Sequence, residues 1–431
     1  MSKKAKSSQR PSSSRSSRYS EAKPSGGASK TTNVGSAKKF HRPLLKELIP
    51  SLVLVFEEKK PASKVLDNVF RHNLRWGSRD RKVFAEVFYE IIRKRYALSY
   101  EAQENINASS DILAHYYLKK NDYHVLEAPD LRGLGRGDVK RAPLWIRYSY
   151  SERFHEVCQS QMADQLKEYY QASEEVAPVF LRANTHLTSV QDLKRILKEE
   201  GIATDKVPAS TSALKLRERQ NIFKSPAFKK GLFEVQDGGS QLIAPFLQVE
   251  PGQRVIDACA GSGGKTLHLA TLLKNTGKVL ALDIYEWKLG ELKKRAKRNS
   301  LQNIETRLIE GQKTIKRLVD SADRLLLDVP CTGSGVFRRN PDSKYRWEAE
   351  DFERIYNLQK EILNSYSKML KVGGKMVYST CSVFHSENQK QVEAFLAENP
   401  GWELEETRSI FVGENDFDGF FMARLKRVAA N

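Results

Sequence analysis

The sequence predicts an α/β protein whose carboxyl-terminal half forms a doubly wound parallel sheet, with a helical region and a small α+β module before it. Three strand-like segments carry this prediction. Residues 254–259 and 279–283 are apolar runs separated by a glycine-rich loop and a helical stretch, so strands and helices alternate. Leu325–Asp328 begins with three leucines, as expected for a central strand covered on both faces, and Lys375–Thr380 is a similar run.

Length and composition limit the class of protein. A chain of 431 residues with 40% hydrophobic residues has room for two or three domains with ordinary cores. No apolar run is as long as a membrane span, and the N-terminus lacks an apolar signal core, so we expect a soluble, cytoplasmic, monomeric protein. The four cysteines form no Cys-x-x-Cys pair and no His cluster accompanies them, so neither disulfides nor a metal site are expected.

The charge distribution suggests a polyanionic partner. The net charge is +19, and residues 1–42 carry eleven Lys or Arg and one acid, which is +10 of that total. This segment has almost no large apolar side chain, so we expect a disordered basic tail that holds RNA backbone or only aids solubility. The remaining +9 belongs to the folded part, which is still basic. Nucleic acid is therefore the expected partner, and a generally solvated basic surface is the alternative.

The rest of the chain divides into three expected domains. Residues 43–140 show helical periodicity and predict an all-α domain. Residues 141–237 combine a helical linker with strands at 179–184 and 232–236 around a helix at 190–200, which predicts the α+β module. Residues 238–431 carry the alternating strands and helices of the catalytic domain.

The glycine-rich loop at 260–264 indicates a nucleoside cofactor. A phosphate-binding Walker loop needs a glycine at position 259, which is Cys259, so a nucleotide triphosphatase is disfavoured. Glycines at the first strand-to-helix turn let the backbone approach a ligand, and Asp283 ends the second strand, where an acid can bind ribose hydroxyls. Because the pyrophosphate-binding Gly-x-Gly-x-x-Gly pattern is missing, S-adenosylmethionine fits better than NAD.

Two thiols and one acid follow strands. Pro330 ends the strand before Cys331, Asp328 is its last residue, and Cys381 follows the strand 375–380. If these strands are neighbours, the three side chains converge at the ligand-binding edge of the sheet. Carbon 5 of cytosine accepts a methyl group only after a thiolate adds to carbon 6, and the thiol must later be eliminated with the help of a base. An acid near ring nitrogen 3 assists. The residue types match this chemistry, although an isolated cysteine is by default a packing residue.

Dispersed motifs over residues 178–427 resemble the NOP/Sun family of RNA cytosine-5 methyltransferases. The motifs are Arg182–Asn184, Gln236–Asp237 with Ser240–Gln241, Asp257–Ala260 with Gly263–Thr266, Asp328–Gly333, Arg339–Asp342, Thr380–Ser382 and Gly419–Ala423. The resemblance implies a Rossmann-like class I methyltransferase domain, with Cys381 as the nucleophile and Cys331 as the thiol that promotes release. It places S-adenosylmethionine on Cys259, Ala260, Gly261, Ser262, Gly263, Gly264, Lys265, Asp283, Gln312 and Asp328.

Two positions depart from the family pattern. Ser262 stands where the family usually has proline, and serine should tolerate that turn. Gln312 stands where the family usually has an aspartate on the adenine side of the cofactor, and an amide can still hydrogen-bond adenine.

The helical region narrows the expected substrate. Arg79–Arg81 through Arg93 resembles the NusB-like RNA-binding domain, which points to the bacterial small-subunit ribosomal RNA methyltransferases of type B within the family. We therefore expect 16S ribosomal RNA as the substrate, with transfer RNA as the alternative. A methyltransferase fold acting on a protein or small molecule, and an assembly factor that has lost catalysis, are two further readings; the basic front half argues against the first and the paired thiols against the second.

Overall fold

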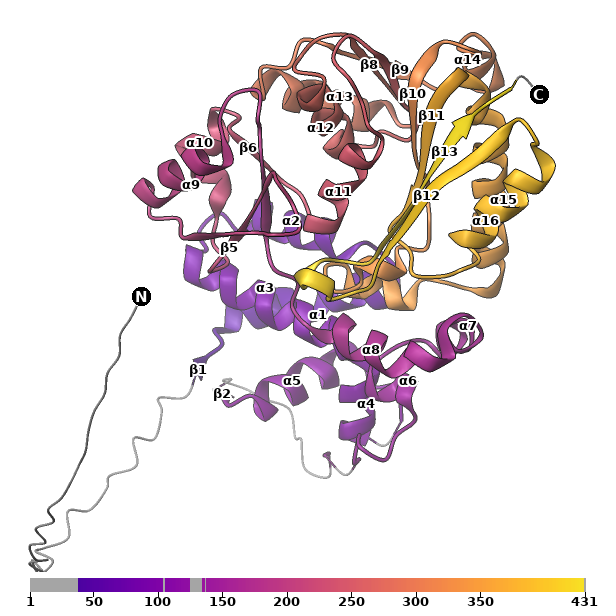
Figure 1. Cartoon of the computed structure of the whole chain (residues 1–431). Helices are drawn as coiled ribbons and strands as arrows, with labels where there is room; N and C mark the ends of the chain where they lie inside the picture. The colour runs from indigo at the N-terminus through magenta and orange to yellow at the C-terminus, as the bar shows by residue number, and fades with distance from the viewer. Residues whose placement is uncertain (1–37, 104, 125–133, 136, 430–431) are drawn as a thin grey trace, which may run out of the picture.

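The structure is a computed structural model of the chain, and it describes residues 38–103, 105–124, 134–135 and 137–429. A group of helices comes first, followed by a four-stranded sheet and a seven-stranded sheet. Figure 1 shows the amino-terminal helices beneath the seven-stranded sheet, with the four-stranded sheet beside it. No helix among the described residues is long and apolar enough to cross a membrane.

The expected disordered tail at residues 1–42 overlaps ordered chain at its carboxyl end. Residues 1–37 lie outside the described residues, but Lys38–Lys39 (β1) pairs in parallel with Tyr123–His124 (β2). The cause is Phe40, which is only 2% exposed and whose N–H bonds to the carbonyl of His124. One buried aromatic ring therefore holds the chain in place just before the first helix begins at Arg42.

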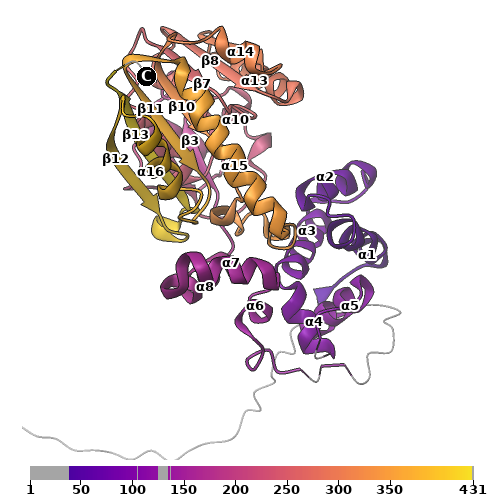
Figure 2. The same ribbon diagram turned by 90° about the vertical axis from the view of Figure 1, so that its right-hand side faces the viewer.

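Five helices form the amino-terminal core. Their apolar residues recur on one face, as the buried residues Leu48, Leu52, Val55 and Phe56 do in the first helix. The helices are α1 (Arg42–Phe56), α2 (Ala62–His72), α3 (Ser78–Arg93), α4 (Arg95–Gln103) and α5 (Ser110–Lys120). Figure 2 shows α3 close to one end of α15 (Ala349–Tyr366), a long helix of the catalytic domain. The hydroxyl of Tyr345 donates a hydrogen bond to the carbonyl of Ile92 at 2.7 Å.

The α+β module is a four-stranded antiparallel sheet in the order β4-β5-β3-β6. Its predicted strands and helix are present, and β4 and β5 are additional. The predicted linker helix is two helices separated by a short turn at residues 163–165. The elements are α6 (Leu144–Arg147), α7 (Glu152–Met162), α8 (Leu166–Glu174), β3 (Phe180–Ala183), α9 (Val190–Glu199), β4 (Thr204–Lys206), β5 (Ala213–Leu216), α10 (Pro226–Lys229) and β6 (Phe233–Val235).

The catalytic sheet has the strand order β12-β13-β11-β10-β7-β8-β9. The predicted doubly wound Rossmann-like fold is confirmed, but β13 runs antiparallel between β11 and β12, so the sheet is mixed and not wholly parallel. The strands are β7 (Arg254–Asp257), β8 (Lys278–Asp283), β9 (Ile304–Leu308), β10 (Ala322–Asp328), β11 (Leu370–Thr380), β12 (Trp402–Ile410) and β13 (Phe420–Arg427).

Helices cover both faces of this sheet. Leu325 and Leu327 belong to one hydrophobic core and Leu326 to the other, which explains why these three consecutive residues of β10 are all apolar. The first core contains α11 (Gly238–Phe246), α12 (Gly264–Leu272) and α13 (Glu286–Arg298). The second contains α14 (Gln312–Lys316), α15 and α16 (Gln389–Glu398). The parallel strands β7, β8, β10 and β11 therefore present their carboxyl ends at one edge.

Candidate active site

The two candidate catalytic thiols lie at the ends of neighbouring strands. Cys331 follows β10 and Cys381 follows β11, and these strands pair in parallel. The backbone pairing ends just before Pro330, with a hydrogen bond from the N–H of Val329 to the carbonyl of Ser379 at 3.0 Å. The two sulfur atoms are 3.3 Å apart, within the distance of a sulfur hydrogen bond.

The surroundings of Cys331 favour the thiol over the thiolate. Its hydrogen bond with Cys381 is the largest cause that raises the pKa of Cys331 well above its usual value, and burial and the charge of Glu387 act in the same direction. Either sulfur atom can be the donor of this S–H···S contact, so the two thiols share one proton site and act as a coupled pair.

An ion pair lies beside the thiols. Asp328 ends β10, and its Oδ2 is 2.6 Å from the Nζ of Lys265, in the first turn of α12. Its Oδ1 accepts a hydrogen bond from the hydroxyl of Ser379 at 3.0 Å. Burial opposes the charge of Lys265, but Asp328 and the nearby Cys381 outweigh it, so the pKa of Lys265 is raised. The pair connects the glycine loop to the thiol-bearing strands.

The glycine loop follows β7 and has left-handed backbone at Gly261 and Gly263. A Cβ on Gly263 would lie 2.5 Å from the Cγ of Leu292, so only glycine fits there. The carbonyl of Ser262 accepts a hydrogen bond from Arg295 at 2.7 Å, which fixes this turn without a proline. Helix α12 begins at Gly264, directly after this turn.

Asp283 holds the opposite side of this loop. It ends β8 and is 7% exposed, and its carboxylate accepts backbone hydrogen bonds from Gly261 at 2.9 Å and Tyr285 at 2.8 Å. A carboxylate has about four acceptor positions, so two backbone donors leave it able to bind ribose hydroxyls. The predicted cofactor residues Cys259 and Ala260 connect β7 to this turn, and the N–H of Ala260 donates to the carbonyl of Leu282 at 2.9 Å.

Gln312 lies at the start of α14, with its side chain turned to another partner. It is exposed, and its amide oxygen accepts a hydrogen bond from the hydroxyl of Ser365 on α15 at 3.0 Å. This contact engages the oxygen, while an amide also carries two donor hydrogens. Contact between Gln312 and a cofactor therefore stays a prediction.

The residues around the loop fit S-adenosylmethionine. Asp257 is buried, its Oδ2 accepts from the hydroxyl of Thr266 at 2.7 Å, and its Oδ1 has no partner among the described residues. Burial raises the pKa of Asp257 to about 7. Together with Asp283 and Asp328, it gives a glycine-lined loop three carboxylates, which suit a ligand with hydroxyl, ammonium and sulfonium groups.

The sequence reasoning missed Glu387, which ties the two thiol-bearing loops together. It is fully buried and accepts hydrogen bonds from the N–H of Thr332 at 2.8 Å, the hydroxyl of Ser382 at 2.6 Å and the amide of Gln359 at 2.9 Å. Burial raises the pKa of Glu387, and these donors oppose the rise. Its only signal in the sequence was an acid six residues after Cys381.

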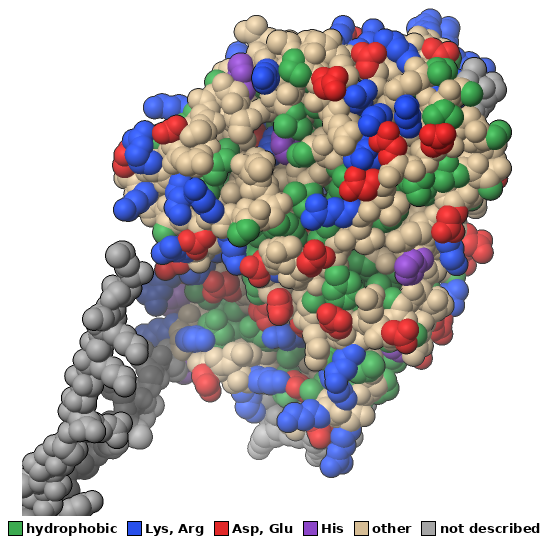
Figure 3. Space-filling model, viewed as in Figure 1, with side chains coloured by type: hydrophobic (Ala, Val, Ile, Leu, Met, Phe, Trp, Pro, Cys, Tyr) green, Lys and Arg blue, Asp and Glu red, His purple; other side chains and the backbone are tan. Residues whose placement is uncertain are grey.

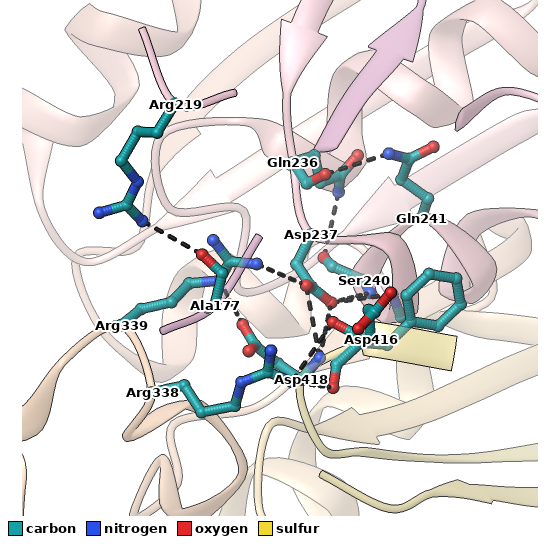
Figure 4. A network of polar contacts seen from close by, with 12 residues as sticks. Ala177, Arg219, Gln236, Asp237, Ser240, Gln241, Arg338, Arg339, Asp416 and Asp418 are labelled. Atoms are coloured by element: carbon teal, nitrogen blue, oxygen red, sulfur yellow. Dashed lines mark hydrogen bonds and ion pairs between the residues drawn. The ribbon is translucent and has the colours of Figure 1, made fainter. Parts of the chain in front are cut away.

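A second buried network joins the catalytic sheet to the start of α11 (Figure 4). Arg339 donates to Asp237 at 2.7 Å and also to Asp418. Burial, with the charge of Asp237, raises the pKa of Asp418 to about 6, and Arg339 opposes this. Asp237 also caps α11 by accepting from the N–H of Gly239 at 2.8 Å. Arg339 of the Arg339–Asp342 motif therefore connects the start of α11 to the segment before β13, beside the site.

Two family models match the chain. The one described as 16S rRNA methyltransferase RsmB/F matches residues 244–426, which contain both thiols. The one described as the RsmF/B-like ferredoxin-like domain matches residues 152–223 and so covers most of the α+β module.

Curated relatives extend the match over more of the chain. Ribosomal RNA small subunit methyltransferase B of Vibrio vulnificus is 33% identical over 292 residues, covering 66% of this chain and 68% of that protein. The protein of the same description from Pasteurella multocida is 32% identical over 334 residues, covering 71% of this chain and 74% of that one.

Solved structures agree with the fold. A crystal structure of PH0851 has a TM-score of 0.74 at 23% identity and covers 90% of this chain and 100% of its own. A methyltransferase homolog protein from Pyrococcus horikoshii has a TM-score of 0.59 at 28% identity and covers 66% of this chain and 97% of its own. The resemblance to the NOP/Sun family is thus confirmed. The chain belongs to the RsmB/F family of 16S rRNA methyltransferases, and S-adenosylmethionine is its methyl donor.

Proposed function

We propose that the protein methylates carbon 5 of a cytosine in 16S ribosomal RNA through a covalent bond between Cys381 and carbon 6. The observation that carries this proposal is the pair of sulfur atoms 3.3 Å apart at the ends of adjacent strands, beside the Asp328–Lys265 ion pair. Methylation of a nucleophilic oxygen or nitrogen needs no thiol, whereas methylation of carbon 5 needs one thiol to add and a base to allow elimination.

The first step uses Cys381 and the ion pair. Cys381 first loses its proton to solvent, its thiolate sulfur bonds to carbon 6, and the electron pair of the C5=C6 double bond moves towards carbon 4 and nitrogen 3. The Asp328–Lys265 pair holds a proton that can be shared with nitrogen 3, which stabilises that charge. S-adenosylmethionine supplies the methyl group as an electrophile at its sulfonium centre. A base paired in RNA must first be exposed so that the thiol reaches its face.

The second step uses Cys331. The hydrogen bond with Cys381 is the main reason that the pKa of Cys331 is high. Once the Cys381 sulfur is bonded to carbon, it no longer carries a negative charge, so the pKa of Cys331 falls and its thiol can release its proton to solvent. The Cys331 thiolate then accepts the proton from carbon 5. The electron pair of that C–H bond restores the C5=C6 double bond, and Cys381 leaves as a thiolate.

Charge on the folded part supports RNA as the substrate. Residues 1–37 carry +7 of the net +19, so residues 38–431 retain +12, and the amino-terminal helices, which resemble the NusB-like domain, are the proposed RNA-binding element. On the face seen in Figure 3, Lys and Arg side chains are interspersed with acidic ones and do not form a single basic patch. We therefore attribute the affinity to several dispersed phosphate contacts.

Two single variants test the roles of the thiols. Cys381→Ala removes the nucleophile, so we expect neither methylation nor a protein–RNA adduct. Cys331→Ala leaves the nucleophile but removes the base, so an adduct that survives denaturation should accumulate after methyl transfer. Denaturing gels with 16S ribosomal RNA and S-adenosylmethionine measure both outcomes, and bisulfite sequencing locates the methylated cytosine.

A buried cysteine outside the site serves as the control. Cys158 in α7 is fully buried in a separate aromatic core, so Cys158→Ala should change stability without changing adduct formation. An adduct in Cys381→Ala and none in Cys331→Ala would reverse the two roles. If both variants methylate RNA at the wild-type rate, the thiols are packing residues and the covalent mechanism is wrong. Methylation of transfer RNA in place of ribosomal RNA would change the proposed substrate alone.

A further inference from the structure

An exposed group of aromatic rings and lysines lies beside the glycine loop at which the cofactor is expected to bind. Trp287 is 60% exposed and Tyr285 is 48% exposed; Tyr285 lies in the short connection after β8, and Trp287 is the second residue of α13. The chain has five tryptophans, all within the described residues, and Trp287 is the only exposed one. Large aromatic faces in water are costly unless a partner covers them. We call Tyr285, Trp287, Lys288 and Lys64 the aromatic–lysine surface.

Two separate domains contribute to this surface. The Nζ of Lys288 is 4.4 Å from the centre of the Tyr285 ring and 5.9 Å from that of Trp287. The Nζ of Lys64, on α2 of the amino-terminal helices, is 5.8 Å from the centre of the Trp287 ring. The start of α2 is attached to the catalytic domain by a hydrogen bond from the N–H of Ala62 to Asp342 at 3.2 Å. The surface therefore bridges the helical and catalytic domains.

The surface lies on the same sheet edge as the thiols. In the strand order β11-β10-β7-β8, three strand spacings separate Cys381 from the end of β8, which is about 14 Å. A stacked single strand advances about 3.4 Å per nucleotide, so a nucleotide within about four positions of the target base can reach Trp287. Asp283 anchors this segment through the N–H of Tyr285, so both rings start from a fixed backbone.

We propose that the aromatic–lysine surface binds single-stranded RNA next to the target cytosine, with a base stacked on Trp287 and phosphates beside Lys64 and Lys288. Exposed aromatic rings flanked by cations are the features by which proteins hold unpaired nucleotides without reading their sequence. Duplex RNA offers no free base face to stack, so the surface favours an unpaired strand. This inference rests on the proposed function, because it assigns the surface to the RNA that carries the target.

Binding of a labelled, cytosine-rich single-stranded RNA, measured by fluorescence anisotropy, tests the proposal. Trp287→Ala should weaken binding by about ten-fold, and Trp287→Phe should restore most of the loss. Lys64→Ala should reduce the dependence of affinity on salt by about one counterion. Phe223 is a matched control, since it is 59% exposed on the α+β module, and Phe223→Ala should bind as the wild type does. The same RNA annealed to its complement should respond little to Trp287→Ala.

Calorimetry with S-adenosylmethionine distinguishes an RNA-binding role of this surface from a cofactor-binding role. All four variants should keep the wild-type affinity for S-adenosylmethionine. If Trp287→Ala binds RNA normally, or if it loses cofactor affinity while RNA binding is unchanged, the surface does not hold RNA. The Cys331→Ala adduct assay reports on the proposed function independently. If Cys331→Ala forms the adduct and Trp287→Ala binds RNA normally, only the proposal for the surface is wrong. If Trp287→Ala binds RNA more weakly and Cys331→Ala forms no adduct, the surface is supported and the covalent mechanism is wrong.

Discussion

Glu387 connects the loops that carry the two thiols, and replacing it should loosen both. In Glu387→Ala the N–H of Thr332 and one of the two amide hydrogens of Gln359 lose their acceptor inside the protein, while the other amide hydrogen can keep the carbonyl of Pro330 at 2.8 Å. The hydroxyls of Thr332 and Ser382 are 3.3 Å apart and can still pair with each other. Each unsatisfied buried donor costs about 1–3 kcal/mol, so two of them lower the free energy of unfolding by ~2–6 kcal/mol.

Glu387→Gln provides a graded comparison. The amide keeps the shape and one acceptor oxygen, which can face the N–H of Thr332 and the amide of Gln359. Its NH₂ then faces the two hydroxyls, which can rotate to accept. The variant loses only the extra strength of a charged acceptor, which is about 1–2 kcal/mol. We therefore expect the free energy of unfolding to fall in the order wild type, Gln, Ala.

Urea denaturation measures these differences, and alkylation by iodoacetamide in the folded state measures the thiols. Glu398 is an exposed acid paired with Lys360, so Glu398→Ala should leave the free energy of unfolding close to that of the wild type. Alkylation of Cys331 and Cys381 should become faster in Glu387→Ala and stay near the wild-type rate in Glu398→Ala. If Glu387→Ala is as stable as the wild type, the network does not hold the loops. If it is less stable but its thiols react unchanged, Glu387 serves stability alone.

Three further predictions concern charge. Burial raises the pKa of Asp257 to about 7, so the folded state binds the carboxyl proton more tightly than the unfolded state does. The resulting stability is fully present below the ordinary pKa of an aspartate and is lost as the pH rises through about 7. Urea denaturation should therefore show the wild type losing up to ~4 kcal/mol relative to Asp257→Asn between about pH 4 and pH 7; parallel pH profiles would contradict this. Asp328→Asn removes the partner of Lys265 and should lower the methylation rate by about 10²-fold or more, with a normal rate counting against a role for the pair. Deletion of residues 1–37, which carry eight Lys or Arg and one acid, should weaken RNA binding and reduce its salt dependence while leaving a salt-dependent component; loss of all RNA affinity would show that the folded part does not bind RNA.

Local patterns in the sequence were enough to identify the strands that carry the site. The leucines before Asp328 and the proline after Val329 indicate a buried strand and its end, because burial and the missing N–H act within a few residues. The same holds for the glycine loop before α12, where left-handed backbone requires glycine. The alternation of these segments also predicted the class of fold, and the motifs predicted the family.

Contacts between distant segments were decided only by the tertiary structure. The two sulfur atoms lie 3.3 Å apart because β10 and β11 are neighbours, and strand order depends on how whole helices and strands pack. The antiparallel insertion of β13 and the approach of Lys64 to Trp287 have the same origin. The environment of Glu387 could not be predicted from the sequence either. The donors that stabilise its buried carboxylate come from three separate segments, and no local pattern specifies which segments meet.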